Sequence, residues 1–354
     1  MPVPQTEPTE AMILDALRSV QDPDLHRDIV SLGFVKDLKV CGGGVAFTIE
    51  LTTPACPVKD LMRSQAERAV GAVPGVANVS VHMSAQVTAS RPVLGDKGTI
   101  PGVKNVIAVS SGKGGVGKST VAVNLACALQ RTGARVGILD ADVYGPNVPL
   151  MLGLTGQPAV VEKKIVPFER HGLQVMSMAL LVAEDQPVIW RGPMLHSAVR
   201  QFLFDVAWHD LDYLVVDLPP GTGDAQLSLS QQAHLIGAII VTTPQDVSVL
   251  DVKKAIRMFQ TVNVPILGVV ENMAWFTPPG HTERYHLFGQ GGGAKIEREF
   301  GVPLLGQVPI EMAVREGGDS GRPITVAEPG SASARALADI AGKVAQRVSI
   351  LNAE

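Results

Sequence analysis

Residues 112–119 have the composition and spacing of a site that binds the phosphates of a nucleoside triphosphate. They read Gly-Lys-Gly-Gly-Val-Gly-Lys-Ser and match the pattern G-x-x-x-x-G-K-[ST] at every position. In such a loop the glycines let backbone N–H groups surround phosphate oxygens, while the lysine reaches the terminal phosphates and the serine binds Mg²⁺. The residues expected to contact the nucleotide are Gly112, Lys113, Gly114, Gly115, Val116, Gly117, Lys118, Ser119 and Thr120.

The flanking residues support this interpretation. Val106–Val109 is an apolar run typical of a buried strand, and residues 120–130 have a helical pattern, so the loop precedes a helix N-terminus that favours anions. The same glycines also match G-x-G-x-x-G, with Asp140 roughly 20 residues on, as in a dinucleotide site. A triphosphate is favoured because it requires Lys118 and Ser119, which a dinucleotide does not; a glycine-rich turn without a ligand is the third alternative.

Two further apolar runs end in carboxylates, where parallel α/β sheets place their ligands. The run at 138–139 leads into Asp140 and Asp142, of which Asp142 is a candidate to orient the attacking water and Asp140 to act on the metal side. The alternative for both is an ordinary capping or turn aspartate. The run at 214–216 ends in Asp217, which is expected to hold the magnesium shell.

The segment after Asp217 reads Leu-Pro-Pro-Gly-Thr-Gly-Asp and predicts a switch. Gly221 can offer its N–H to the γ-phosphate and move when that phosphate leaves. Lys113 is either a surface cation or a second lysine that reaches the phosphates across a dimer interface and stabilises transferring charge. Asn272 follows a strand and is expected to read the adenine edge, or else to be a turn residue, and Pro309 is expected to pack on the base.

Strand and helix patterns divide the chain into two domains and a linker. Residues 1–90 predict a small α+β domain, with helices at 9–20 and 57–73 and strands at 44–51 and 76–83. Residues 91–104 mix Pro and Gly as a linker does. Residues 105–354 predict a doubly wound, mostly parallel α/β sheet. Its strands are expected at 106–110, 136–140, 213–217, 238–242, 266–270 and 304–308.

Composition excludes several classes of protein. The net charge of −4 gives no electrostatic basis for binding nucleic acid or a membrane surface. No apolar run is long enough to span a membrane, and the polar first residues do not resemble a signal peptide, so a cytoplasmic location is expected. Three cysteines do not make a disulfide scaffold and fit a reducing compartment.

Several segments together resemble the Mrp/ApbC family of iron–sulfur cluster carrier ATPases. That family belongs to the deviant phosphate-loop class that includes the nitrogenase iron protein and the MinD and ParA ATPases. The matching segments are GKGGVGKST, DADVYGPNVP, WRGPM at 190–194, DLPPGTGD, VTTPQ at 241–245 and ENM at 271–273. Residues 1–90 look like the small domain of iron–sulfur assembly factors, including LTTPACP at 51–57, so the resemblance covers the whole chain.

The resemblance implies a homodimer that binds ATP, hydrolyses it slowly and delivers clusters to apo iron–sulfur proteins with assembly factors as partners. It assigns phosphate and Mg²⁺ binding to Lys118 and Ser119, action across the dimer to Lys113, positioning of water to Asp142, and the second switch to Asp217 and Gly221.

One departure concerns the cluster site. The family usually has a Cys-x-x-Cys shortly after ENM, and the cysteines of two chains hold a bridging [4Fe–4S] cluster. Here Pro278 and His281 stand at those positions. Proline cannot bind iron, and His281 or His286 could, but such a cluster normally takes four thiolates.

The three cysteines differ in how well their expected surroundings suit a cluster ligand. Cys127 lies in an apolar helical run and is expected to be a buried small hydrophobe, and Cys41 is expected to be incidental. Cys56 precedes a helix expected to start near Pro57, whose dipole would lower the thiol pKa and favour thiolate. It is therefore the candidate cluster ligand, with a buried structural cysteine as the alternative.

Three functions are compatible with these residues. The leading one is an ATPase that carries iron–sulfur clusters. The second is a cluster-free, ATP-dependent dimeric switch or scaffold of the MinD/ParA type, supported by the missing Cys-x-x-Cys; against it, residues 331–354 form no basic amphipathic membrane helix. The third, a metabolic kinase or synthetase, lacks an identifiable substrate pocket.

Overall fold

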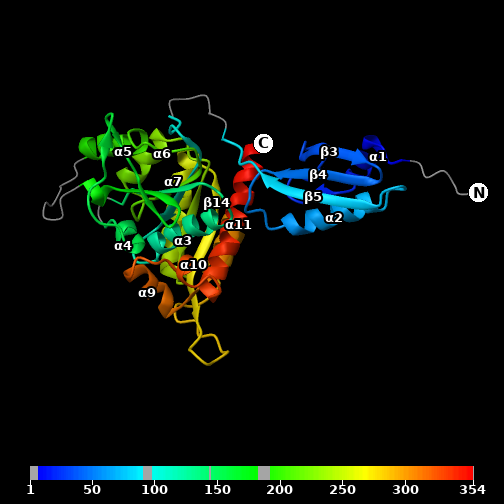
Figure 1. Ribbon diagram of the computed structural model, residues 1–354. Helices are drawn as coiled ribbons and strands as arrows, with labels where there is room; N and C mark the ends of the chain where they lie inside the picture. Colours follow the sequence, from blue (N-terminus) through cyan, green and yellow to red (C-terminus); the bar gives the residue numbers. More distant parts are fainter. Residues whose placement is uncertain (1–6, 91–97, 143–144, 182–191, 354) are drawn as a thin grey trace, which may run out of the picture. The chain divides into compact units, whose positions relative to one another are not determined.

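The computed structural model describes residues 7–90, 98–142, 145–181 and 192–353. The chain forms two compact units, shown in Figure 1. One comprises the described residues up to Thr88 together with those from Ser349 onward, and the other spans Ala89–Val348. Within the described ranges, no helix is both long and apolar enough to cross a membrane.

The N-terminal unit packs two helices against a three-stranded sheet of order β3-β4-β5. Its elements are α1 (Glu10–Leu17), β1 (Gln21–Asp22), β2 (Arg27–Asp28), β3 (Val35–Cys41), β4 (Gly44–Leu51), α2 (Lys59–Gly71) and β5 (Asn78–Ala85). Alternating residues of β4, among them Phe47 and Ile49, are buried against the apolar faces of α1 and α2. The α+β character is as predicted, but β3 was not expected. It is an edge strand with charged, exposed residues such as Lys36 and Lys39, so it lacks the apolar alternation that marks β4.

The larger unit contains an eight-stranded sheet of order β10-β11-β7-β12-β6-β13-β14-β15. All neighbouring strands are parallel except β10, which is antiparallel to β11. The strands are β6 (Val103–Ser111), β7 (Val136–Asp140), β10 (Phe168–Arg170), β11 (Leu173–Ser177), β12 (Leu211–Asp217), β13 (Gly237–Thr242), β14 (Ile266–Phe276) and β15 (Leu304–Ile310). A small hairpin, β8 (Val160–Val161) and β9 (Lys164–Ile165), lies outside this sheet.

Helices follow most strands of this sheet, as a doubly wound fold requires. They are α3 (Lys118–Arg131), α4 (Val148–Leu152), α5 (Gly192–Phe204), α6 (Asp224–Gln232), α7 (Asp246–Thr261), α8 (Gly292–Phe300), α9 (Met312–Asp319), α10 (Ile324–Ala327) and α11 (Ala332–Ala353), with a 3₁₀ turn at Met178–Leu181. Every residue of β7, β12 and β13 is buried, which the continuous Val, Ile and Leu runs of a two-sided sheet explain. The predicted fold class is confirmed.

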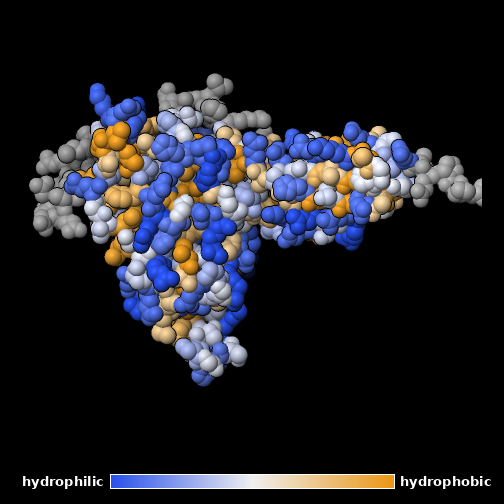
Figure 2. Space-filling model, in the orientation of Figure 1, coloured by the Kyte–Doolittle hydropathy of each residue, from blue (hydrophilic) through white to orange (hydrophobic). Residues whose placement is uncertain are grey.

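Two of the differences between observed and expected boundaries concern the linker and the strand β14. Residues 91–97 of the expected linker lie outside the described residues, while Val103 and Lys104 already belong to β6. β14 continues six residues past the expected end of its strand and leads into the loop 277–291, which projects beyond the sheet in Figure 1. Figure 2 shows neutral to hydrophilic side chains on that projection.

Candidate nucleotide site

The phosphate-loop residues lie around a cavity at the carboxyl end of the sheet. The cavity has a volume of about 200 Å³. It lies where β6 ends and α3 begins, beside the ends of β7 and β12. Its walls are Ser111, Lys113, Gly114, Gly115, Gly117, Lys118, Ser119, Thr120, Asp142, Asn147, Met151 and Pro220. The fold therefore brings the glycine loop and Asp142 to the same cavity, although they come from different strand ends.

The glycine loop depends on backbone conformations that other residues avoid. Gly115 and Gly117 have φ angles of +79° and +81°. Gly117 ends the loop as the N-cap of α3, and a Cβ atom there would lie 2.2 Å from Nδ2 of Asn272. A Cβ on Gly112 would meet backbone atoms of Asp251 in α7 at 2.4 Å. Close packing thus requires glycine at both 112 and 117, and the backbone conformation requires it at 117 as well.

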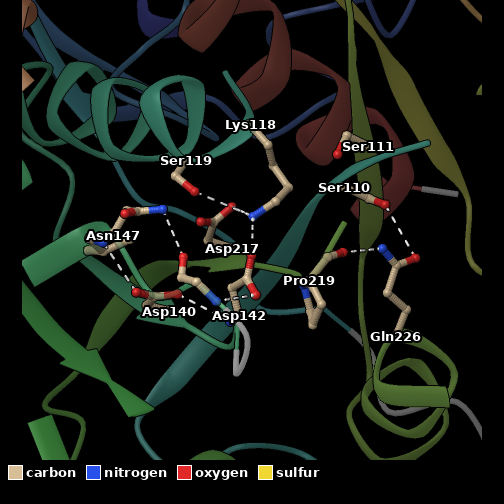
Figure 3. Close-up of polar contacts among 12 residues, drawn as sticks. Ser110, Ser111, Lys118, Ser119, Asp140, Asp142, Asn147, Asp217, Pro219 and Gln226 are labelled. Carbon is tan, nitrogen blue, oxygen red and sulfur yellow. Dashed lines mark hydrogen bonds and ion pairs between the residues drawn. The ribbon is translucent and has the colours of Figure 1, made fainter. Parts of the chain in front are cut away.

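Lys118 is buried between two carboxylates at the centre of the site (Figure 3). Its Nζ donates to Oδ1 of Asp217 at 2.6 Å and lies 3.7 Å from Oδ2 of Asp142. The same Nζ lies 3.4 Å from Oγ of Ser119. The two carboxylates hold the ammonium at the cavity, where the phosphates of a nucleotide would compete with them for it.

One of the two carboxylate oxygens of Asp217 is available to a further ligand. The residue is fully buried, and its Oδ2 has no hydrogen-bond partner among the described residues. Burial raises the pKa of Asp217, and the nearby ammonium of Lys118 opposes that rise. A buried carboxylate oxygen without a donor, next to the Ser119 hydroxyl, matches the oxygen ligands that Mg²⁺ prefers. These residues therefore fit a magnesium ion.

Asp140 makes different contacts from those expected on the metal side. Its Oδ1 accepts from the backbone N–H of Asp142 at 3.2 Å, and its Oδ2 accepts from the N–H of Val148 at 3.2 Å and the hydroxyl of Ser177 at 3.0 Å. Burial raises the pKa of Asp140 to about 7, and the charge of Asp217 contributes to that rise. In this structure Asp140 fixes the segment that carries Asp142.

Asp142 faces the cavity with little exposure to solvent. Its exposed fraction is 6%, and its Oδ1 accepts from the N–H of Gly145 at 3.2 Å. The position near Lys118 is compatible with the predicted role of orienting water. Val143 and Tyr144 of the same motif lie outside the described residues.

The predicted switch at Gly221 is held in place by β6. Gly221 has a φ angle of +93°, and its N–H donates to the carbonyl of Ser111 at 3.0 Å. That N–H would have to leave Ser111 before it could be offered to a γ-phosphate.

Lys113, Asn272 and Pro309 lie in settings that the sequence did not indicate. Nζ of Lys113 is 3.5 Å from Oε1 of Gln245, at the start of α7. The Asn272 amide donates to the carbonyl of Val116 at 2.9 Å, so it contacts the backbone of the phosphate loop. Pro309 is buried, and its carbonyl accepts from the Ser333 hydroxyl at 3.2 Å. The Asn272 amide thus braces the phosphate loop, and the roles expected for Asn272 and Pro309 at the base stay predictions.

The expectation of a lowered thiol pKa at Cys56 is wrong. Cys56 is half-buried against the core of the N-terminal unit, and burial raises its pKa, with the charges of Asp24 and Asp22 acting in the same direction. These effects on the thiol pKa outweigh the opposite effect of the helix dipole at the nearby start of α2. Cys127 is buried as expected, and burial raises its pKa to about 12. Cys41 is exposed at the end of β3.

The positions of the family's cluster cysteines lie on the projecting loop. Pro278 is partly exposed and His281 is exposed, and the N–H of His281 donates to the carbonyl of Pro278 at 3.1 Å. Nδ1 of His286 lies 3.1 Å from the carbonyl oxygen of Ala274. Among the residues that the structure describes, no group of three or more His, Cys, Asp and Glu could hold a metal ion. Of the segment WRGPM, residues 190 and 191 lie outside the described residues.

Several residues that shape the site were not identified as site residues from the sequence. Ser177 meets Asp140 from β11, and Gln226 in α6 contacts both Ser110 and Pro219. Glu271 is fully buried and accepts from the N–H of Gly293 at 2.6 Å. The ENM segment at 271–273 was the available signal for Glu271, whereas Ser177 and Gln226 lie in elements with other polar residues and gave none.

Both units of the chain match models of known protein families. Residues 102–345 match the model of a ParA-type family described as NUBPL iron-transfer P-loop NTPase, and residues 10–81 match that of an iron-sulfur cluster assembly protein. The chain is 53% identical over 348 residues to an iron-sulfur cluster carrier protein of Synechocystis sp., covering 97% of this chain and 98% of the relative. It is 50% identical over 342 residues to a protein of the same name from Deinococcus radiodurans, covering 96% and 95%.

Solved structures resemble the larger unit. A nucleotide-binding protein from Archaeoglobus fulgidus in complex with ADP is 41% identical, with a TM-score of 0.58 over 65% of this chain and 90% of that one. The cell division ATPase MinD of Pyrococcus furiosus is 26% identical, with a TM-score of 0.52 over 68% of this chain and 98% of that one.

Proposed function

The chain belongs to the iron-transfer P-loop NTPases that include the iron–sulfur cluster carrier proteins, and on this premise we propose that it binds and hydrolyses ATP and carries iron–sulfur clusters to apoproteins. In this proposal it acts as a cytoplasmic homodimer, with cluster-assembly factors and apo iron–sulfur proteins as partners. The small N-terminal unit supports the cluster part, because its family is that of iron-sulfur cluster assembly proteins.

One observation carries the ATP part of the proposal. Lys118 is buried between Asp217 and Asp142 at the head of α3, beside a cavity lined by the glycine loop. A buried ammonium with two carboxylates is a costly arrangement that contributes little to stability on its own. It is useful when an anionic ligand enters, since the ammonium is already placed for the phosphates.

The proposal assigns the following roles to the other residues of the site. Backbone N–H groups of residues 112–120 surround the phosphates, Lys118 turns toward the terminal ones, and Ser119 with Asp217 would hold Mg²⁺. Mg²⁺, when bound, neutralises charge on the phosphate oxygens. Asp142 accepts a hydrogen bond from the attacking water, and the Gly221 N–H leaves Ser111 to bind the γ-phosphate. Asp140 acts through the backbone of Asp142.

Lys113→Ala is expected to separate binding from hydrolysis. The ammonium of Lys113 lies beside Gln245 and lines the cavity, and in this proposal it reaches the phosphates bound to a second chain. We expect the Kd for ATP to stay within about threefold, while kcat or ATP-dependent dimerisation falls about 10- to 100-fold. Titration calorimetry, steady-state hydrolysis and light scattering with ATP measure the three quantities.

The matched control is Gln245→Ala, which removes the contact of Lys113 within the same chain and keeps the lysine. We expect it to hydrolyse ATP at close to the wild-type rate. A Lys113→Ala protein that dimerises and turns over normally would place Lys113 on a solvated surface.

Anaerobic reconstitution with iron and sulfide tests the cluster part. A carrier is expected to take up near-stoichiometric iron and sulfide and to show a visible cluster spectrum. Cys56→Ser should weaken cluster transfer to an apo acceptor severalfold if that thiolate is a ligand, even though burial raises the pKa of its thiol. The control is Cys41→Ser, because Cys41 is exposed and lies in the same unit. Equal transfer rates for both variants would remove Cys56 from the ligand set.

A second candidate function is a cluster-free ATP-dependent switch or scaffold. The observation that favours it is the presence of Pro278 and His281 where the family has cysteines, since proline offers no ligand atom. In that case the reconstituted protein would bind no iron and would still hydrolyse ATP.

A further inference from the structure

Hydrogen bonds connect the loop after β12, the residues Ser110 and Ser111 at the end of β6, and Gln226. The Gly221 N–H donates to the carbonyl of Ser111 at 3.0 Å. The Ser110 hydroxyl donates to Oε1 of Gln226 at 3.4 Å, and Nε2 of Gln226 donates to the carbonyl of Pro219 (Figure 3). Gln226 therefore bridges Ser110, the residue that precedes Ser111, and the loop that contains the predicted switch.

The composition of this loop explains why a side chain is needed. Pro219 and Pro220 have no backbone N–H, so these two residues cannot donate to the neighbouring strand as the residues of β12 do. The loop is then held by the N–H of Leu218, which donates to the carbonyl of Val109 at 2.9 Å, by the N–H of Gly221 and by the Pro219 carbonyl. Gln226 supplies the donor for the Pro219 carbonyl, from the first turn of α6.

Burial makes this contact specific. The exposed fraction of Gln226 is 1%, so its amide is shielded from bulk solvent and depends on partners inside the protein. An apolar side chain of similar size would fill the same space. The amide is needed only for the two hydrogen bonds. Packing alone therefore does not explain why a glutamine stands at position 226.

We propose that Gln226 is a positioning residue for ATP hydrolysis, an inference that rests on the proposed function. It fixes Pro219, which lies two residues after Asp217 and two before Gly221. Through this one point it sets both the carboxylate at the end of β12 and the N–H of the switch relative to the phosphate loop. Gln226 does not line the phosphate cavity, and it acts through the backbone of the loop.

Gln226→Met tests the proposal, because methionine keeps the length of the side chain and removes both polar groups. We expect kcat to fall about 10- to 100-fold, with the KM for ATP within about threefold, because a misplaced loop impairs the reaction more than the binding of phosphates. Hydrogen exchange should speed up in residues 218–223 and stay unchanged in α3. Ser110→Ala, which keeps the bond to Pro219, should give a smaller loss of kcat.

Gln231→Met is the matched control, because Gln231 is exposed on the same helix. It should leave kcat, KM and exchange as in the wild type. A Gln226→Met protein with wild-type kcat would overturn the proposal. So would a general loss of exchange protection across the larger unit together with a raised KM, which would show a role in stability alone. If the wild type hydrolysed no ATP, the proposed function would fail, and exchange in residues 218–223 would still decide whether Gln226 holds the loop.

Discussion

Lys118→Ala is expected to reduce ATP hydrolysis by about 100- to 1,000-fold. Losing one preorganised donor to a developing negative charge typically has an effect of this size. In this chain the ammonium is buried and already placed at the phosphate cavity by Asp217 and Asp142, so the substitution removes a preorganised positive charge from the site. Steady-state release of phosphate measures the rate, and a nucleotide titration measures binding.

The same substitution has a consequence for stability. Without the lysine, Asp217 remains fully buried beside Asp142 with no counter-ion, and its pKa should rise further. Breaking a buried ion pair from one side costs about 3–5 kcal/mol. The free energy of unfolding of the nucleotide-free protein should therefore fall, which a denaturant titration measures.

Paired variants separate the two effects. Lys118→Met keeps the methylene stem and should lose both stability and hydrolysis. Adding Asp217→Asn removes the unpaired buried charge, so the double variant should recover most of the lost stability and none of the activity. Lys39→Ala, an exposed lysine of the N-terminal unit, is the control for loss of one positive charge. Wild-type turnover in a folded Lys118→Met protein would show that the nucleotide site lies elsewhere.

Features encoded in contiguous residues could be predicted from the sequence. The strand, glycine loop and helix around Lys118 form one local unit, and the apolar runs that end in Asp140 and Asp217 mark the carboxyl ends of neighbouring strands. Because such ends lie at one edge of a parallel sheet, these residues were expected to meet. The meeting of Lys118 with both Asp217 and Asp142 follows from β6, β7 and β12 being neighbours.

Contacts between distant residues could not be predicted in this way. The hydroxyl of Ser177 reaches Asp140 only because β11 lies beside β7. β10 and β11 are short strands without a long apolar run, so the sequence did not predict them. Cys56 shows the limit of a local electrostatic argument. The start of α2 is visible in the sequence, but the burial and the acidic neighbours that raise the thiol pKa depend on how the unit packs.

Gly117→Ala is expected to reduce hydrolysis strongly, for a different reason from Lys118→Ala. The φ angle of Gly117 is +81°, a conformation that costs a non-glycine residue roughly 1–2 kcal/mol. An added Cβ would also lie 2.2 Å from Nδ2 of Asn272, and that amide is held by the Val116 carbonyl. The loop or Asn272 must therefore move, and we expect kcat/KM for ATP to fall by at least about 100-fold.

Gly133→Ala isolates the cost of the backbone conformation. Gly133 follows the other end of α3, with a φ angle of +101° and open space around the added Cβ. That variant should lose stability and keep its kcat/KM for ATP, so the difference between the two variants measures the contact with Asn272. Gly117→Ala combined with Asn272→Ala removes the clash and should regain stability relative to Gly117→Ala alone, while hydrolysis stays low because the loop has lost its brace. Wild-type kcat/KM in Gly117→Ala would mean that Asn272 yields freely and does not define the phosphate loop.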